Sequence, residues 1–315
     1  MKGLYILMKK FKKIISFMMV VSLMFTADLV TVKAGTCQEQ KQSTNNLREY
    51  DLVTGKESVI SMTSNSTLMS NNTLKSNTIT NKSSYNPSSI SPFTIFGTDN
   101  RTQVKSTTSH PYYPIAHLEI TYTDSTVANA TGFMVSKNVL ITCGHACMSY
   151  KSNAPIKTAT VYPGRNGTSK PSTAKLSRYY VCENFTYYND SDEDDYAIWV
   201  LNSDIGNTTG WLGIGYNTNN SFFTSNTFTL TGYPGDKPTG TMWTASGSIT
   251  SCATLAFYYK IDTIAGQSGA PVYIYKSGSG YVAYGINVAE YETENTAKRI
   301  TQVLFDWLMN NNYIS

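Results

Sequence analysis

The chain carries Gly266-Gln267-Ser268-Gly269-Ala270-Pro271, a serine held on a tight turn between two glycines. Glycines relieve the steric limits on the backbone, so amide groups can approach a reacting carbonyl while the serine hydroxyl projects between them. The pattern predicts a nucleophilic serine with an oxyanion hole. Turns of small residues also close ordinary hairpins, so the prediction depends on a base and an acid elsewhere in the chain.

The sequence around this turn, residues 94–315, has the composition of an all-β protein. It is rich in Tyr, Thr, Val and Ile and is broken about every ten residues by Gly, Pro, Asn or Ser. Its length suffices for one large domain or two small fused ones. Strands are expected at 116–122, 131–135, 139–142, 196–201, 227–231 and 282–288. These short strands predict a sandwich or a barrel.

The C-terminal end departs from the strand pattern. Thr301 can serve as a helix N-cap, and apolar residues recur at helical spacing around it. These residues are Ile300, Val303, Leu304, Trp307 and Leu308. We expect one terminal helix packed on the body of the protein.

The base must be sought among three histidines, because imidazole is the usual partner of a nucleophilic serine. His110 lies in a Ser-His-Pro turn, and His117 lies on an alternating strand, where a structural role is favoured. His145 follows the apolar strand 139–142 and falls among small residues. Its imidazole is therefore expected at a strand edge, facing a cleft, and we assign it as the base.

The acid should be a carboxylate that enters an apolar strand, where it can be partly buried against the imidazole. The acidic run 190–195 is followed by the apolar run 196–201, and Asp195 directly adjoins that strand. The remaining acidic residues are read as a solvated turn, with a calcium site as the lesser alternative. The chain order His145, Asp195, Ser268 suits a site assembled between two β-barrels.

The N-terminal segment 1–34 has the features of a secretory signal peptide. Lysines at 9–13 precede an uncharged apolar run at 14–25, and Val32-Lys33-Ala34 follows, so cleavage is expected after Ala34. An uncleaved anchor is the lesser alternative. The segment holds six of the 25 Lys and Arg and one of the 21 Asp and Glu, which leaves 19 against 20. The exported chain is nearly neutral, so nucleic acid is not an expected partner.

Residues 35–93 are dominated by Ser, Thr and Asn, with sparse apolar residues that show no period. Such a segment cannot bury enough surface to offset its ordering entropy, so we interpret it as a pro-segment or a solvated linker. Composition alone does not separate a passive spacer from an inhibitory pro-segment.

Cysteine usage predicts neither a cystine-stapled scaffold nor a zinc site. The chain has five cysteines, at positions 37, 143, 147, 182 and 252, and the odd count argues against a regular disulfide framework. Cys143 and Cys147 lack a second pair at zinc spacing. We expect no metal in the site and no cofactor.

Several stretches together resemble the bacterial glutamyl endopeptidase family of chymotrypsin-like, or trypsin-like, secreted serine proteases. The resemblance runs from about Gly97 to Trp307 and is carried by residues 131–135, 139–145, 163–167, 195–197, 232–234, 262–263 and 266–271. It implies two six-stranded antiparallel β-barrels with the site between them, a C-terminal α-helix, and synthesis as a secreted zymogen.

The resemblance also implies residue roles. Ser268 is the nucleophile, His145 the base and Asp195 the orienting carboxylate, and the amides of Gly266 and Ser268 form the oxyanion hole. The domain would comprise residues 94–315, with a new amino terminus near Thr94 that could help to bind an acidic side chain.

This chain departs from the family pattern beside the histidine. Family members commonly carry a disulfide there, and its two places correspond to Ala146 and Ala130 in this sequence. Whether Cys143 and Cys147 are free or paired is left open by the sequence.

The substrate-binding residues differ as well. The resemblance assigns Thr263 to glutamate recognition, but Asn287 stands where the family has a histidine, and an amide brings no positive charge. Glu290, with two further glutamates after it, would favour a basic or neutral substrate if it faced the site, although a solvated loop is the preferred interpretation. Asp262 could select Lys or Arg, although a structural role is preferred.

The sequence thus predicts a secreted, extracellular serine endopeptidase that acts on proteins or peptides, with a preference for Glu or Asp before the scissile bond. The alternatives are an active protease with basic or neutral specificity and a non-catalytic protease-fold protein that binds a partner. We expect a monomer with no stable membrane association after signal cleavage.

Overall fold

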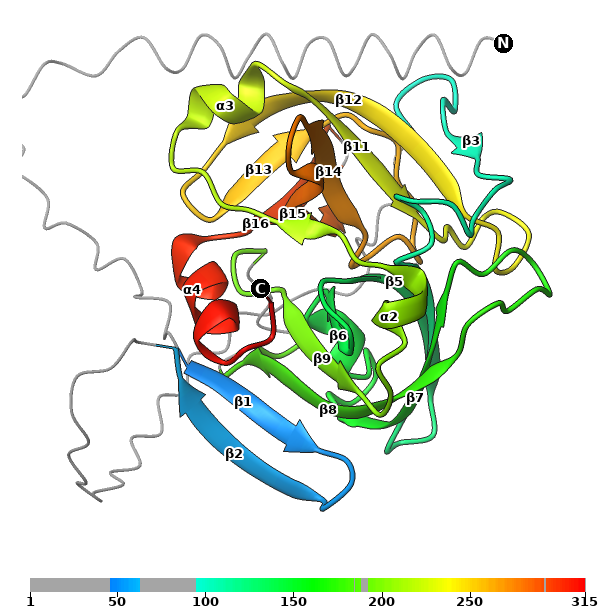
Figure 1. Ribbon diagram of the computed structural model, residues 1–315, viewed down its shortest axis with the longest axis vertical. Coiled ribbons are helices and arrows are strands. Elements are labelled where there is room, and N and C mark those ends of the chain that lie inside the picture. Colours follow the sequence, from blue (N-terminus) through cyan, green and yellow to red (C-terminus); the bar gives the residue numbers. More distant parts are fainter. Residues whose placement is uncertain (1–45, 63–94, 184, 188–191, 292, 315) are drawn as a thin grey trace, which may run out of the picture. The chain divides into compact units, whose positions relative to one another are not determined.

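Two closed, six-stranded antiparallel β-barrels contain most of the described residues (Figure 1). The computed structural model describes residues 46–62, 95–183, 185–187, 192–291 and 293–314, which belong to one compact unit. The two-barrel fold expected from the resemblance is confirmed. The predicted signal peptide, and residues 35–45 and 63–93 of the predicted pro-segment, lie outside the described residues.

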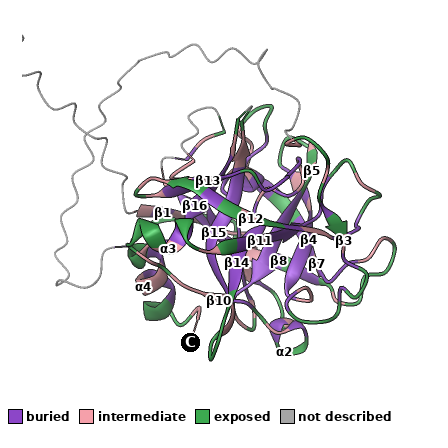
Figure 2. Cartoon of the chain, turned by 90° about the horizontal axis from the view of Figure 1, so that it is seen from above, coloured by how far each residue is buried: buried purple, intermediate pink, exposed green. Residues whose placement is uncertain are grey.

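The first barrel closes because β8 pairs with β7 and also with β9. Its strands are β4 (Ile115–Tyr122), β5 (Val127–Met134), β6 (Val139–Thr142), β7 (Ile156–Pro163), β8 (Ala174–Cys182) and β9 (Ala197–Leu201). Phe133, Tyr179 and Trp199 are fully buried inside it. Buried residues follow the strands of both barrels, as Figure 2 shows.

The second barrel closes through the pairing of β15 with β16. Its strands are β11 (Thr227–Gly232), β12 (Trp243–Cys252), β13 (Ala256–Tyr259), β14 (Pro271–Lys276), β15 (Gly280–Glu290) and β16 (Asn295–Arg299). Two short strands extend it, β3 (Thr102–Gln103) beside β12 and β10 (Gly213–Ile214) parallel to β15. Phe223, Phe228, Phe257 and Tyr259 fill its core. Each predicted strand overlaps an observed one, namely β4, β5, β6, β9, β11 or β15.

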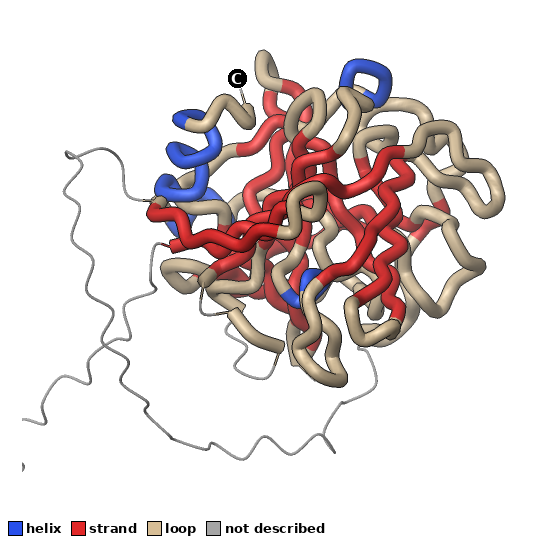
Figure 3. The backbone as a smooth tube through the Cα atoms, turned by 90° about the horizontal axis from the view of Figure 1, so that it is seen from below, coloured by secondary structure: helices blue, strands red, loops and turns tan. Residues whose placement is uncertain are grey.

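Helices are few and short in the described chain, and they lie outside the strands (Figure 3). They are η3 (His145–Cys147), α2 (Gly206–Thr209), α3 (Asn220–Thr224) and α4 (Gln302–Asn310). The predicted terminal helix is α4, and Thr301 caps it by accepting a hydrogen bond from the Leu304 amide at 3.3 Å. Trp307 packs against Tyr180 of β8, whereas Val303 is exposed, so the inward face is narrower than expected. None of the described helices has the length and apolar character needed to cross a membrane.

Residues 46–62 correct the solvated-linker alternative for this part of segment 35–93. They form a hairpin of β1 (Asn46–Asp51) and β2 (Lys56–Ser61), and β1 pairs with β8 of the first barrel. Leu47 is fully buried, and Tyr50 stacks on Tyr179 with ring centroids 4.6 Å apart. The hairpin can order because it joins an existing sheet edge and shares the barrel's core.

Candidate active site

His145 and Asp195 meet because the strands that carry them are paired. Thr142 at the end of β6 lies opposite Ala197 at the start of β9, so residues after 142 and before 197 share one edge of the barrel. The Asp195 carboxylate accepts from the His145 amide at 2.8 Å and from Nδ1–H at 2.7 Å. Asp195 is 1% exposed. The carboxylate therefore fixes both the backbone position and the ring orientation of His145.

The other ring nitrogen of His145 faces a thiol. Cys143 Sγ lies 3.5 Å from Nε2, and Cys143 is fully buried, whereas the His145 side chain is 22% exposed. Burial lowers the pKa of His145, but the neighbouring Asp195 and Cys143 raise it, and the net result is a pKa well above 6.5. Sequence reasoning did not detect the Cys143 contact, because nothing in the spacing of positions 143 and 145 fixes the rotamer of the thiol.

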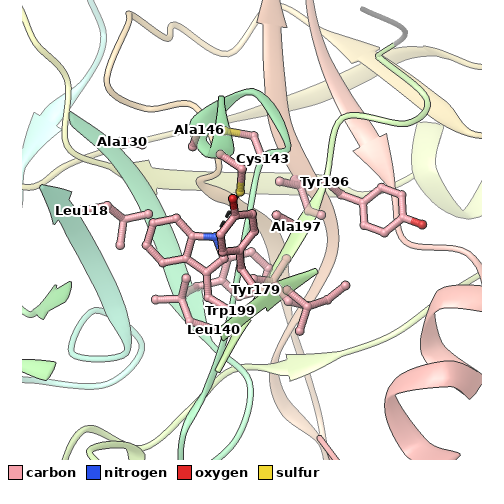
Figure 4. Close-up of a cluster of buried hydrophobic side chains, with 14 of the residues drawn as sticks. Leu118, Ala130, Leu140, Cys143, Ala146, Tyr179, Tyr196, Ala197 and Trp199 are labelled. Atoms are coloured by element: carbon pink, nitrogen blue, oxygen red, sulfur yellow. Dashed lines mark hydrogen bonds between the residues drawn. The ribbon is translucent and has the colours of Figure 1, made fainter. Parts of the chain in front are cut away.

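The loop around His145 is anchored by apolar packing. Figure 4 shows Ala130, Ala146 and Trp199 in one buried cluster, and the Trp199 indole N–H donates to Cys147 Sγ at 3.3 Å. Cys143 and Cys147 are both free thiols. Alanines thus occupy the two places expected to carry the family disulfide, and both are buried in the core of the first barrel.

The serine turn lies between the two barrels. The Ser268 carbonyl accepts from the Thr131 amide of β5 at 2.9 Å, and the Gly269 amide donates to the Asn287 carbonyl of β15 at 2.7 Å. Gly266 and Gly269 have φ of +95° and +85°. A Cβ at Gly269 would clash with Thr131 O and Thr142 Oγ1 and would lie 3.0 Å from the Cys143 amide. The turn is therefore pressed against the end of β6, next to the segment that carries His145.

Asn287 supports this turn from the second barrel. Its side chain is 1% exposed, its Nδ2 donates to the Gln267 carbonyl at 3.1 Å, and its Oδ1 accepts from the Tyr259 hydroxyl at 2.5 Å. Both ends of the amide are thus engaged by the protein, at the position expected to bind substrate.

Asp262 and Thr263, which lie six and five residues before Ser268, are fully buried. The Asp262 carboxylate accepts from the amides of Phe96 and Asn100 at 2.8 and 3.0 Å, which is the structural role preferred for it. The Thr263 hydroxyl donates to Glu290 Oε1 at 3.0 Å. Glu290 therefore faces Thr263, and the interpretation of this glutamate as part of a solvated loop is wrong.

A buried guanidinium, which sequence reasoning did not single out, holds the residue before Ser268. The Arg101 side chain is 0% exposed and pairs with Asp99 and Asp236 at 2.9 and 2.6 Å. Its Nη1 lies 3.4 Å from Gln267 Oε1, which also accepts from the Ile264 amide at 3.1 Å. Asp99 is two residues away from Arg101, but Asp236 and Gln267 are 135 and 166 residues away, so no local pattern could have indicated the whole set of partners.

The other two histidines lie in structural surroundings. His117 is buried, and Arg165 Nη1 donates to its Nδ1 at 3.0 Å. Burial, together with the charge of Arg165, lowers the pKa of His117 to about 4, so the ring is neutral. His110 Nε2 lies 3.2 Å from the Trp211 carbonyl at an exposed position. His145 alone among the three is bound to a carboxylate in the described chain.

Metal-ligating groups gather at the same site. Ligand atoms of Cys143, His145 and Asp195 lie within 4.8 Å of one another, which is close enough to hold an ion. These atoms already contact each other in the arrangement that orients an imidazole for proton transfer.

The acidic run 190–195 was the lesser candidate for a calcium site. Residues 190 and 191 lie outside the described residues, and Asp192 Oδ2 accepts from the Tyr291 hydroxyl at 2.9 Å.

Comparison with known proteins identifies the family. No family model matches the chain. It is 37% identical over 224 residues to the glutamyl endopeptidase of Bacillus licheniformis, with 69% of this chain and 68% of that protein covered. The chain belongs to the chymotrypsin-like glutamyl endopeptidase family. A Bacillus subtilis protein named extracellular metalloprotease is also 37% identical, over 223 residues, with 70% of each chain covered.

A solved member of the glutamyl endopeptidase family has the same fold. The structure of Glu endopeptidase in complex with MPD superposes with a TM-score of 0.60 at 29% identity, and the match covers 70% of this chain and all of that one. This chain is therefore a serine endopeptidase, and its substrates are proteins or peptides.

Proposed function

We propose that His145, Asp195 and Ser268 form the catalytic triad of this endopeptidase. The observation that supports the proposal most directly is the double contact of Asp195 with the amide and Nδ1–H of His145. The serine turn supports it further, because Gly269 lies against Thr142 and the Cys143 amide, beside the same histidine. Base and acid are joined directly, and the nucleophile adjoins the segment that holds the base.

The proposed reaction is acyl transfer to the serine and then to water. Ser268 Oγ attacks the peptide carbonyl carbon while His145 Nε2 takes the hydroxyl proton. The negative oxygen is stabilised by the amides of Gly266 and Ser268, which donate to no protein acceptor in the described chain. His145 then gives its proton to the leaving amine. Water, deprotonated by His145, attacks the acyl ester and frees the acid and Ser268.

The proposed export and proteolytic processing of the chain follow from its N-terminal composition. Segment 1–34 directs export and is removed, and cleavage near Thr94 separates residues 35–93 from the endopeptidase domain 94–315. The proposal of an extracellular protein is supported by a relative that is itself named extracellular. We propose that the mature domain acts as a monomer without stable membrane association.

The proposal is tested by labelling and digestion in one experiment. Purified processed protein is treated with an arylsulfonyl fluoride and then given an unbiased peptide library, with cleavage sites and protein mass read by mass spectrometry. The expected result is one sulfonyl group on Ser268 and loss of all cleavage. Cleavage that persists after full labelling of Ser268, or an intact protein that cuts nothing before labelling, would support a non-catalytic binding protein or another nucleophile.

The acid limb of the pH–rate profile should lie above pH 6.5. His145 must be neutral to accept the serine proton, and its pKa lies well above its ordinary value, so kcat/KM rises only as the pH passes that pKa. The charged His145 ring, beside Asp195, stabilises the fold below pH 6.5. This contribution to the free energy of unfolding is lost as the pH rises through the pKa of His145 in the folded protein. Because Cys143 contributes to the raised pKa, Cys143→Ala should move the limb to lower pH.

The measurement is kcat/KM against pH for the wild type, Cys143→Ala and Cys252→Ala. Cys252 lies in the second barrel and serves as the matched control. An acid limb that stays in place in Cys143→Ala, or that moves equally in both variants, would contradict the coupling of the thiol to His145.

A further inference from the structure

The pairing of Glu290 with Thr263 brings a carboxylate to a residue assigned to substrate recognition. Thr263 lies five residues before Ser268 and is fully buried, and its hydroxyl donates to Glu290 Oε1 at 3.0 Å. Glu290 ends β15, the strand that carries Asn287. The Thr263 hydroxyl therefore already donates its hydrogen bond to a carboxylate of the protein itself and is not available to a substrate.

The Glu290 carboxylate also lies within electrostatic reach of the catalytic histidine. Burial raises the pKa of Glu290 above its usual value, and the Thr263 hydrogen bond and the charges of His145 and Arg101 only partly offset this rise. No ion pair joins Glu290 to a Lys or Arg in the described part of the chain, and Oε2 has no hydrogen-bond partner there. A half-buried carboxylate with one oxygen open to a partner can accept a cation from outside the protein.

We propose that Glu290 determines which substrate residue precedes the scissile bond, and that it selects Lys or Arg and disfavours Glu and Asp. This inference rests on the proposed function of the triad. It assigns the substrate class to Glu290, which the sequence linked to a basic substrate only on the condition that it faced the site, and not to Thr263, Asn287 or Asp262.

The neighbouring groups leave the selection to Glu290. An acidic substrate side chain would meet a like charge at Thr263 and would find its hydroxyl donor occupied. Asn287 cannot compensate, since its Nδ2 already donates to the Gln267 carbonyl. Asp262 cannot compete for the cation on equal terms, because both of its oxygens accept backbone amides. A lysine or arginine, by contrast, would supply the missing partner of Oε2.

The test compares peptides that differ only in the residue before the scissile bond, namely Lys, Gln or Glu. We expect wild-type kcat/KM to favour Lys over Glu by a factor on the order of 10² to 10³, the usual size of one desolvated charge pair. Glu290→Gln should remove most of this ratio, while the Gln peptide changes little. Glu294→Gln is the matched control, because Glu294 lies directly before β16, four residues after Glu290, and accepts from Thr250 at an exposed position.

The outcomes separate this inference from the proposed triad. A preference for Glu in the wild type, or a Lys-to-Glu ratio that Glu290→Gln leaves unchanged while Ser268 still labels, overturns the role of Glu290 alone. Failure to cleave any peptide or to label Ser268 overturns the triad. Should Glu290→Gln not fold, the wild type gives a second measurement: n-butylammonium should inhibit competitively and butyrate should not, and the reverse order overturns the inference.

Discussion

Ser268→Ala is expected to lower kcat by a factor on the order of 10⁶, the loss seen when a serine nucleophile that acts with its base is removed. The reason is that base and orienting acid have no function without the hydroxyl they activate. The double variant Ser268→Ala with His145→Ala should therefore be only slightly slower than Ser268→Ala alone. The measurement is single-turnover and steady-state hydrolysis of one peptide, with residual cleavage read by mass spectrometry.

Ser277→Ala is the matched control, because Ser277 lies exposed in the turn between β14 and β15. Its kcat should equal that of the wild type. If losses from Ser268→Ala and His145→Ala multiply in the double variant, the two residues act independently and the proposed triad is incorrect.

The contact between His145 and Asp195 could be predicted from sequence because the positions of both residues follow from strand ends. An apolar strand followed by His145 and an apolar strand preceded by Asp195 need only one antiparallel pairing to meet, and β6 and β9 provide it. The all-β class was predictable for a similar reason, since short strands and frequent turns are local features of the chain, whereas the two-barrel arrangement was expected only from the family resemblance. The terminal helix followed from one cap residue and a 3.6-residue period.

Contacts that depend on the orientation of a side chain could not be predicted from strand ends. Position 287 was identified by resemblance, but its partners lie elsewhere in the fold: the Gln267 carbonyl belongs to the serine turn and the Tyr259 hydroxyl to β13. Glu290 had two possible directions, toward solvent or toward Thr263, and the bulge in β15 between Asn287 and Ala289 decides which side of the sheet each later residue faces.

The hairpin was missed because composition was averaged over the whole of 35–93. Ser, Thr and Asn dominate that average, yet residues 46–51 read Asn-Leu-Arg-Glu-Tyr-Asp, with Leu47 and Tyr50 buried. Two buried side chains cannot support an independent hairpin. They suffice here because β8 already provides an edge and Tyr179 a stacking surface, neither of which is encoded near residue 47.

Leu47→Ala should therefore lower the free energy of unfolding of the unprocessed chain by about 2 to 5 kcal/mol, the cost of removing a fully buried leucine side chain. The residue lies in the segment proposed to be released, so the loss would show that the hairpin shares the core of the first barrel. Val59→Ala is the matched control, because Val59 is 53% exposed on β2 of the same hairpin, and it should change stability by less than about 0.5 kcal/mol. Urea unfolding followed by tryptophan fluorescence measures both. Equal effects in the two variants would show that the hairpin opens independently of the barrel, whereas a large effect of Leu47→Ala alone means that cleavage near Thr94 leaves a hairpin still held by β8.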